Sequence, residues 1–186
     1  MSTASATTDL PAQTIVLGGG CFWCTEAVFV RVRGVLHVTS GYANGHTPHP
    51  TYEQVCTGET GYNEVVRVAY DPTQVSLRQL LEVFMATHDP TTLNRQGHDV
   101  GTQYRSGIYY SNEADCAVAQ AVLDEAHAAL NAQVVTELAP LQCFFEAEAY
   151  HHHYFERNPN LGYCAHVVAP KVQKFVQTFA QLVRHD

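Results

Sequence analysis

The sequence predicts one α/β (α+β) domain, a two-layer sandwich whose mixed sheet is built on a ferredoxin-like split βαβ core. Three observations lead to this fold class. Short apolar runs typical of strands alternate with stretches of helical periodicity, in the order β-α-β-β-α-β-α-β followed by one more helix. The length of 186 residues is enough for one domain and marginal for two. No internal repeat or linker divides the chain, so residues 13–186 are expected to form a single domain.

The first half of the chain supplies three of the expected strands. An apolar run that ends in glycines predicts a buried strand at 13–20, and a short helix is expected from Cys21 to Gly34. A second strand is expected at 35–45, where the chain runs into a Gly/Asn turn. The alternating pattern at 63–72 predicts a third strand, which a proline ends.

The second half is richer in predicted helix. Apolar residues at helical spacing follow Ser76, a good N-cap, and Ser111 is the expected cap of the clearest helix. A polar, glycine-marked loop over 91–107 is too long for a simple connector. The expected elements are helices at 76–90, 111–130 and 170–184, strands at 108–111 and 134–138, and a segment from 143 that begins as a strand, turns helical near Tyr150 and ends in a loop at 158–164.

Composition and charge exclude several classes of protein. The net charge is −8 and the ten Lys and Arg residues are scattered, which makes nucleic acid or an anionic membrane a poor partner. Residues 1–12 lack the basic and apolar regions of a signal peptide and are expected to form a disordered tail. No stretch approaches the roughly 18 apolar residues of a membrane span. We therefore expect a cytoplasmic monomer with neither nucleic-acid nor membrane partners.

The six cysteines of a chain without a secretion signal are more often buried, metal-bound or catalytic than paired in a disulfide scaffold. Cys21 follows three glycines and is expected to begin a helix, where free N–H groups and the macrodipole stabilise a thiolate. A buried structural cysteine is an equally good interpretation of this position alone. Phe22 and Trp23 beside it are either an apolar cage over the thiol or simply core residues.

Cys21 and Cys24 form a C-x-x-C pair that has two further interpretations. A thioredoxin-like thiol–disulfide oxidoreductase would use both thiols, but the Phe-Trp interior is bulky for such a motif. A zinc-dependent interaction module would need two more ligands. The other cysteines are isolated, and the consecutive histidines at 151–153 would point in different directions from a helix, so zinc is disfavoured.

Polar loops elsewhere carry a more specific signal. Tyr52 and Glu64 flank one turn-rich loop, Asp99 and Tyr104 lie in another, and Cys164 ends a third. Tyrosines and a carboxylate that converge on a cysteine can protonate or hydrogen-bond an oxygen leaving group. Taken separately, each of these residues is ordinary for an exposed loop.

Together these stretches resemble a known family, peptide methionine sulfoxide reductase A. The resemblance runs from about residue 14 to 164 and rests on motifs in the family's order: GGGCFW, GYANGHTPHPTYEQVCTGETGYNEVVRVAYDP, HDPTT, RQGHDVGTQYRS, HHHYFERNP and GYC. The combination of G-C-F-W with G-T-Q-Y-R-S and the P-T-Y…G-x-x-E loop is highly specific.

The resemblance implies a thiol-dependent reaction. Cys21 would attack the sulfur of methionine S-sulfoxide, free or in proteins, and become a sulfenic acid, which Cys164 would resolve to a disulfide. An external dithiol, thioredoxin in the family and dithiothreitol in vitro, would reduce that disulfide. The implied enzyme repairs proteins after oxidative damage and binds neither a cofactor nor a metal.

The resemblance also implies the residues of the pocket. Phe22 and Trp23 would hold the S-methyl group of the substrate, and Glu64 would donate a proton to the sulfoxide oxygen. A carboxyl in an apolar pocket is suited to this because desolvation raises its pKa. The remaining implied roles are hydrogen bonds to the oxygen from Tyr52 and Tyr104, positioning by Asp99, and a further pocket tyrosine at Tyr154.

The resolving thiol is the point where this chain departs from the family. Many members have glycine at the position of Cys24, and here no cysteine follows Cys164, which excludes a relay through a cysteine-containing tail. Residues i and i+3 on a helix have Cβ atoms about 5–6 Å apart, whereas a disulfide needs about 3.5–4.5 Å. A loop at 156–166 could bring Cys164 to Cys21, so we favour Cys164 and keep Cys24 as the alternative. The expected structural cysteines are Cys56, Cys116 and Cys143, the last two in contexts that suit burial.

Overall fold

The fold is built on one mixed β-sheet. The structure is a computed structural model that describes residues 10–186, so most of the predicted tail at 1–12 lies outside the described residues. Within the described part, six strands pair in the order β7-β6-β1-β3-β2-β8, and all pairs are antiparallel except β6 with β7. The strands are β1 Gln13–Gly19, β2 Val35–Ala43, β3 Asn63–Tyr70, β6 Ser106–Tyr110, β7 Glu137–Pro140 and β8 Phe144–Glu146.

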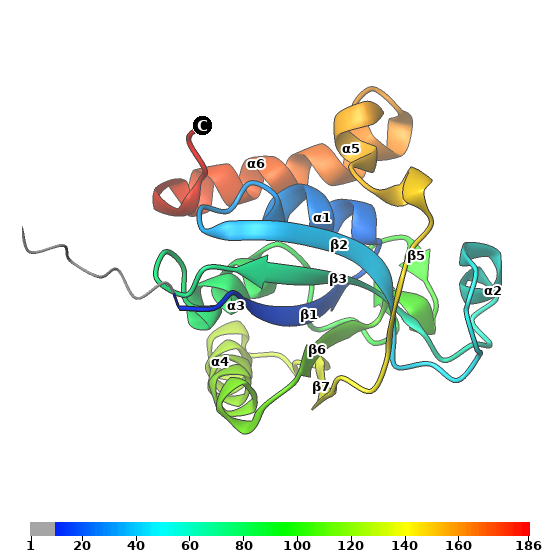
Figure 1. The fold of residues 1–186 in the computed structure, drawn as a ribbon, viewed down its shortest axis with the longest axis horizontal. Coiled ribbons are helices and arrows are strands. Elements are labelled where there is room, and N and C mark those ends of the chain that lie inside the picture. Colours follow the sequence, from blue (N-terminus) through cyan, green and yellow to red (C-terminus); the bar gives the residue numbers. More distant parts are fainter. Residues whose placement is uncertain (1–9) are drawn as a thin grey trace, which may run out of the picture.

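The inner strands follow the predicted split βαβ pattern, because β1, β2, β3 and β6 are connected through two helices, α1 and α3. The chain between β7 and β8 crosses from one edge of the sheet to the other, as the yellow ribbon in Figure 1 shows. This crossing covers a second apolar cluster on the sheet. The helices are α1 Phe22–Phe29, α2 Tyr52–Cys56, α3 Leu77–Ala86, α4 Glu113–Leu130, α5 Tyr154–Arg157 and α6 Ala169–Thr178.

The main core lies between the sheet and the helices α1 and α3. Ile15 and Leu17 of β1 alternate with residues that face the other cluster, as the period of a strand requires. Leu80 and Phe84 of α3 pack into the same core at helical spacing. Each fully buried side chain of this size contributes about 1.5–3 kcal/mol of hydrophobic free energy relative to exposure.

The structure confirms one of the two predicted N-cap residues and changes the other. Ser76 caps α3 in a capping box, in which its hydroxyl accepts from Gln79 N–H while the Gln79 side chain accepts from Ser76 N–H. The predicted cap Ser111 is wrong by one residue. Asn112 caps α4, and its Oδ1 accepts from Asp115 N–H at 2.8 Å. Asparagine is as good an N-cap as serine, so the helix begins at the later of two suitable residues.

Short elements inside the predicted loops differ most from the expectation. The loop at 91–107 holds a hairpin, β4 Arg95–Gln96 and β5 Asp99–Val100, and then a 3₁₀ turn, Thr102–Tyr104. The loop before β3 holds α2, and the strand expected at 134–138 starts only at Glu137. Elements of two to five residues are too short for a periodic pattern to reveal.

The predicted loop at 156–166 is also wrong. After α5 and a turn, helical backbone begins at Gly162, passes through a π-helical turn at Cys164–Val168 and continues into α6. A separate 3₁₀ turn, Ala180–Leu182, replaces the end of the helix expected at 170–184. Pro170 therefore lies just after the π-helical turn, near the start of α6, and not at the first residue of the whole helical stretch. No helix in the described part of the chain is both long and apolar enough to span a membrane.

Candidate active site

Cys21 is presented at the junction of β1 and α1. The strand ends at Gly19, Gly20 turns the chain with φ +91°, and Cys21 is the N-cap of the helix. A Cβ atom at Gly20 would lie 2.6 Å from Cβ of Gln96, so both the conformation and the space require glycine. The sequence prediction of a strand, a glycine turn and a thiol at a helix start is confirmed.

The thiol is more buried than the sequence indicated. Cys21 is only 8% exposed, and this burial, with the nearby Glu64 and Cys24, raises its pKa well above the usual value. Hydrogen bonds from the Trp23 N–H and the Tyr163 hydroxyl lower the pKa of Cys21, but by less than burial raises it. Burial therefore opposes the thiolate that the start of the helix was expected to stabilise.

Glu64 of β3 lies beside Cys21 in an environment that keeps it protonated. The side chain is 1% exposed, and its Oε1 accepts the Phe22 N–H at 3.3 Å. Burial raises its pKa to about 8, and Asp99 adds to this while the Phe22 N–H opposes it. The second oxygen, Oε2, is buried without any hydrogen-bond partner. A neutral carboxyl with one unpaired atom is prepared to donate a proton to an incoming oxygen.

Aromatic side chains surround the start of α1. The rings of Trp23 and Tyr154 stack at 3.8 Å with an interplanar angle of 6°, and Trp23 Nε1 donates to Nδ1 of His151 at 3.1 Å. Phe22 is fully buried and contacts His151 at 5.0 Å and Tyr52 at 6.4 Å between ring centroids. Phe22 is thus part of the core, whereas half-buried Trp23 forms the accessible wall.

The two predicted oxygen-binding tyrosines reach the same region from different loops. Tyr52 begins α2, where its N–H donates to Glu148 Oε2 at 3.1 Å. Tyr104 ends the 3₁₀ turn after β5. Burial first, and then the neighbouring Glu64, raise the pKa of both tyrosines well above its usual value. Both hydroxyls therefore keep their protons and can donate hydrogen bonds.

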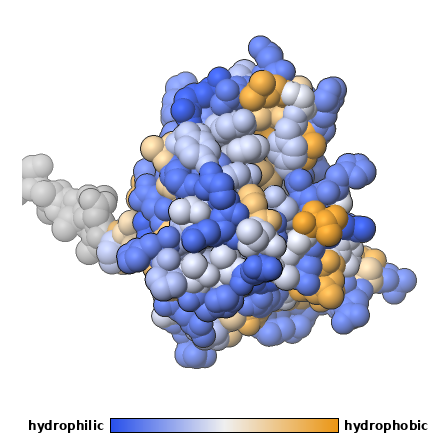
Figure 2. Space-filling view, turned by 90° about the vertical axis from the view of Figure 1, so that its right-hand side faces the viewer, coloured by the Kyte–Doolittle hydropathy of each residue, from blue (hydrophilic) through white to orange (hydrophobic). Residues whose placement is uncertain are grey.

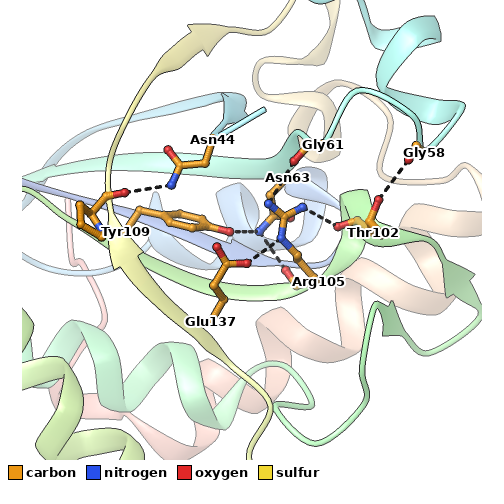
Figure 3. A network of polar contacts seen from close by, with 9 residues as sticks. Asn44, Gly58, Gly61, Asn63, Thr102, Arg105, Tyr109 and Glu137 are labelled. Atoms are coloured by element: carbon orange, nitrogen blue, oxygen red, sulfur yellow. Dashed lines mark hydrogen bonds and ion pairs between the residues drawn. The ribbon is translucent and has the colours of Figure 1, made fainter. Parts of the chain in front are cut away.

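A polar network holds the Tyr104 turn against the strand of Glu64 (Figure 3). Asn63, next to Glu64 in the chain, donates to the carbonyl of Arg105 at 3.0 Å. The Arg105 guanidinium in turn donates to the Glu137 carboxylate at 2.9 Å and to the carbonyls of Thr102 at 2.9 Å and Gly61 at 3.1 Å. A planar guanidinium with several donors suits this bridging between loops. The network explains how segments far apart in the chain come to one site.

Asp99 contacts the site through a residue that sequence analysis left without a role. Tyr163 donates its hydroxyl to Asp99 Oδ2 at 2.7 Å, and the same hydroxyl lies 3.7 Å from Cys24 Sγ. His151 is the second residue that was missed. Both lie within stretches that resemble the family, GYC and HHHYFERNP, and this position is the only signal in the sequence that could have identified them.

The thiols Cys21, Cys24 and Cys164 lie together in a small buried cluster with Ala27 and Val168. Cys164 is fully buried in the π-helical turn, so it does not lie in the exposed loop that was predicted. The other cysteines are less buried than expected: Cys116 and Cys143 are half-buried and Cys56 is exposed.

In Figure 1, α1 begins toward the right side of the molecule, the side on which α2 and α5 also lie. Figure 2 shows the same side, on which separate hydrophobic areas interrupt a mostly hydrophilic surface. A buried thiol, a neutral carboxyl beside it and further thiols in the same cluster define the site of a thiol-dependent oxidoreductase.

Comparison with known proteins identifies the family. The sequence profile described as "Peptide methionine sulfoxide reductase" matches residues 13–183. "Peptide methionine sulfoxide reductase MsrA" from Acinetobacter baumannii (strain SDF) is 54% identical over 92% of this chain and 98% of that protein. The protein of the same name from Saccharolobus solfataricus is 51% identical over 92% of this chain and 97% of that protein.

A solved structure agrees with the sequences. Reduced Mxr1 from Saccharomyces cerevisiae superposes with a TM-score of 0.76 at 36% identity, over 81% of this chain and 87% of that one. The chain belongs to the peptide methionine sulfoxide reductase family. It is a peptide-methionine (S)-S-oxide reductase, an oxidoreductase that converts methionine sulfoxide to methionine by cysteine chemistry.

Proposed function

We propose that Cys21 is the nucleophile and Glu64 the proton donor of this reduction. The observation that carries the assignment is Glu64 Oε2, a buried atom with no partner on a carboxyl whose pKa is raised to about 8 by burial. Leaving such an atom unpaired costs about 1–3 kcal/mol, which the oxygen of a bound sulfoxide would recover by accepting its hydrogen bond.

The chemistry follows from the polarity of the sulfoxide. Its sulfur is partly positive and its oxygen partly negative, so a proton on the oxygen favours attack on the sulfur by Cys21. Tyr52 and Tyr104 add hydrogen bonds to the oxygen, while Trp23 packs on the S-methyl group. Phe22, which was predicted for the same contact, is fully buried and supports the pocket from the core. The S–O bond of the substrate breaks, methionine leaves with two more electrons, and Cys21 is oxidised to the sulfenic acid that carries the oxygen.

For the second half of the cycle, we propose Cys164 as the resolving thiol and Cys24 as the alternative. Attack of the Cys164 thiol on the Cys21 sulfenic acid forms a disulfide and releases water, which balances the reaction. Burial of Cys164 means that the turn at Cys164–Val168 has to rearrange for this step. A π turn supports the proposal, since such turns interrupt the regular helix and recur at functional sites.

The reductant and setting are proposed on the family's behaviour. Thioredoxin, or dithiothreitol in vitro, would reduce the disulfide by exchange, and Mxr1 of Saccharomyces cerevisiae is known in complex with Trx2. We propose a monomeric, cytoplasmic enzyme that acts through residues 13–186 as one domain on oxidised proteins and free methionine sulfoxide. It would use neither a bound cofactor nor a metal, and neither nucleic acid nor a membrane.

One assay tests the assignment of the nucleophile. The protein is supplied with racemic methionine sulfoxide and dithiothreitol, and methionine is measured by chromatography. We expect half of the substrate to be consumed, no methionine from Cys21→Ser, and an unchanged yield from Cys116→Ser, which removes a thiol of α4 outside the site as a control. Full activity of Cys21→Ser would contradict the proposal. Reduction of insulin disulfides without any methionine would instead indicate a general thiol–disulfide oxidoreductase.

A further inference from the structure

Glu26 is a buried carboxyl without a part in the reaction proposed above. It lies in α1, five residues after Cys21, and is 1% exposed. Both oxygens are occupied: Oε1 accepts the backbone N–H of His153 at 2.6 Å, and Oε2 accepts the hydroxyl of Ser40 at 3.4 Å. Burying a carboxyl is costly unless its hydrogen bonds are satisfied, and the shortest of these bonds goes to the segment before α5.

The segment that Glu26 holds is the one that sets the orientation of Trp23. His151 accepts the indole N–H of Trp23, and Tyr154 stacks on its ring, so the two contacts lie on either side of His153. His153 itself has a left-handed backbone with φ +54°. A non-glycine residue in this conformation is held there by its surroundings, and the Glu26 bond to its N–H is a direct restraint.

We propose that Glu26 is a positioning residue for sulfoxide binding. By anchoring the backbone of His153, it keeps His151 and Tyr154 against Trp23 and so fixes the aromatic wall that receives the S-methyl group. This inference rests on the proposed function, in which Trp23 contacts the substrate.

A cation is not a competing explanation for the short distances around Glu26. Glu26, His153 and Glu156 offer possible ligand atoms within 4.8 Å of one another. However, the Glu26 oxygens are already bonded, and Glu156 forms an ion pair with Arg31 at 2.8 Å. Burial raises the pKa of Glu26 to about 7, against the opposing effect of the His153 N–H. Protonation leaves one oxygen as an acceptor, so the anchor does not require the charged form.

The test uses the fluorescence of Trp23, the only tryptophan in the chain, together with steady-state kinetics in dithiothreitol. Glu26→Leu removes the acceptor, keeps roughly the same volume and leaves the His153 N–H without its partner. We expect KM for methionine sulfoxide to rise about tenfold, in line with the loss of a charge-assisted hydrogen bond, while kcat changes less and the Trp23 emission shifts. Glu26→Gln retains an acceptor oxygen and should restore both readouts.

Glu156→Gln is the matched control, because it weakens a partly exposed ion pair between α5 and Arg31, which follows α1 in the chain. It should leave KM and emission at their wild-type values. If Glu26→Leu fails to fold by circular dichroism, Glu26→Asp should show the same changes to a smaller degree. Wild-type KM and emission in a folded Glu26→Leu or Glu26→Asp variant would overturn the proposal, as would a loss of kcat alone in that variant. The emission needs no turnover, so it tests the anchor even if the protein reduced no sulfoxide.

Discussion

Two buried regions meet at the first turn of α1, and they differ in their polar groups. We call them the substrate side, around Glu64 and His151, and the thiol side, around Cys24 and Cys164. On the substrate side, two buried polar atoms, Glu64 Oε2 and His151 Nε2, have no partner. On the thiol side, Cys24 and Cys164 pack in an apolar cluster, and the Tyr163 hydroxyl, 3.7 Å from Cys24 Sγ, is already bonded to Asp99.

The difference indicates how each region works. An unpaired buried polar group costs about 1–3 kcal/mol, so it persists where a ligand will pair with it. In the proposed function, the oxygen of the bound sulfoxide supplies the missing partner of Glu64 Oε2. In the proposed cycle, the buried Cys164 has to move to react with Cys21, so we expect recycling to be the step that depends on movement of the chain. Substitutions on the two sides should separate these steps.

The largest effect is expected at Glu64. Glu64→Gln keeps the shape but removes the transferable proton, so the rate of one turnover should fall by about 10²–10⁴, the usual contribution of a general acid. In the wild type the donor is protonated below its pKa of about 8, so the rate should lose this contribution as pH rises through that value. Rapid-quench measurement of methionine across pH 6–10 checks both points, and a wild-type profile in the Glu64→Gln variant would remove Glu64 from the mechanism.

The second comparison is between the two candidate resolving thiols. Cys164→Ser should form one methionine per enzyme at the wild-type rate and then lose cycling with thioredoxin, because the sulfenic acid has no partner thiol. Cys24→Ser should keep both activities. Stoichiometric and thioredoxin-coupled assays are run on each variant. The opposite pattern would assign the resolving role to Cys24.

A smaller effect is expected at Tyr163, which lies between the two regions. Its hydroxyl partly offsets the effect of burial on the pKa of Cys21, so Tyr163→Phe should slow the first turnover about fivefold, the equivalent of one hydrogen bond of about 1 kcal/mol. Tyr150→Phe is the control, since Tyr150 is 49% exposed and its hydroxyl contacts only Glu148 at 3.5 Å. Equal rates for the two variants in the rapid-quench assay would exclude Tyr163 from the first step.

A last effect concerns the stability of the fold on the substrate side and not the rate of the reaction. Burial raises the pKa of Glu64 above the roughly 4.3 of an unfolded chain, so the native state binds the extra proton and its stability falls as pH rises toward about 8. The free energy of unfolding in urea should decrease by up to about 1.4 kcal/mol per pH unit for this group between pH 5 and 8. Glu64→Gln should reduce the slope. An unchanged slope in that variant would mean that Glu64 is ionised in the native protein.

The sequence was most informative where a pattern is long or a motif is specific. The alternation in β3, the helical spacing in α3 and the glycine turn before Cys21 follow from local physical chemistry and are confirmed. The convergence of Glu64 with the Cys21 turn is long-range, and only the resemblance to the family indicated it. The sequence around Arg105 gives no indication that its guanidinium forms hydrogen bonds with three different segments.

The loop at Cys164 shows why part of the site could not be predicted. Pro, Asn and Gly at 158–162 are typical of a turn, and the structure does have one there, but Val168 and Phe175 are buried and draw the chain into a helix immediately afterwards. Tertiary packing thus overrides the local signal. The burial that raises the pKa of Cys21 is likewise set by residues far away in the sequence.

In the proposed cycle, Cys21 reacts on one side of the first turn of α1 and is resolved from the other side by Cys164. Peptide mapping by mass spectrometry can identify the pairing after the wild-type protein has reacted with one equivalent of methionine S-sulfoxide without reductant, followed by alkylation of free thiols. We expect a Cys21–Cys164 disulfide with Cys24 alkylated. A Cys21–Cys24 disulfide with Cys164 alkylated would contradict the proposed cycle.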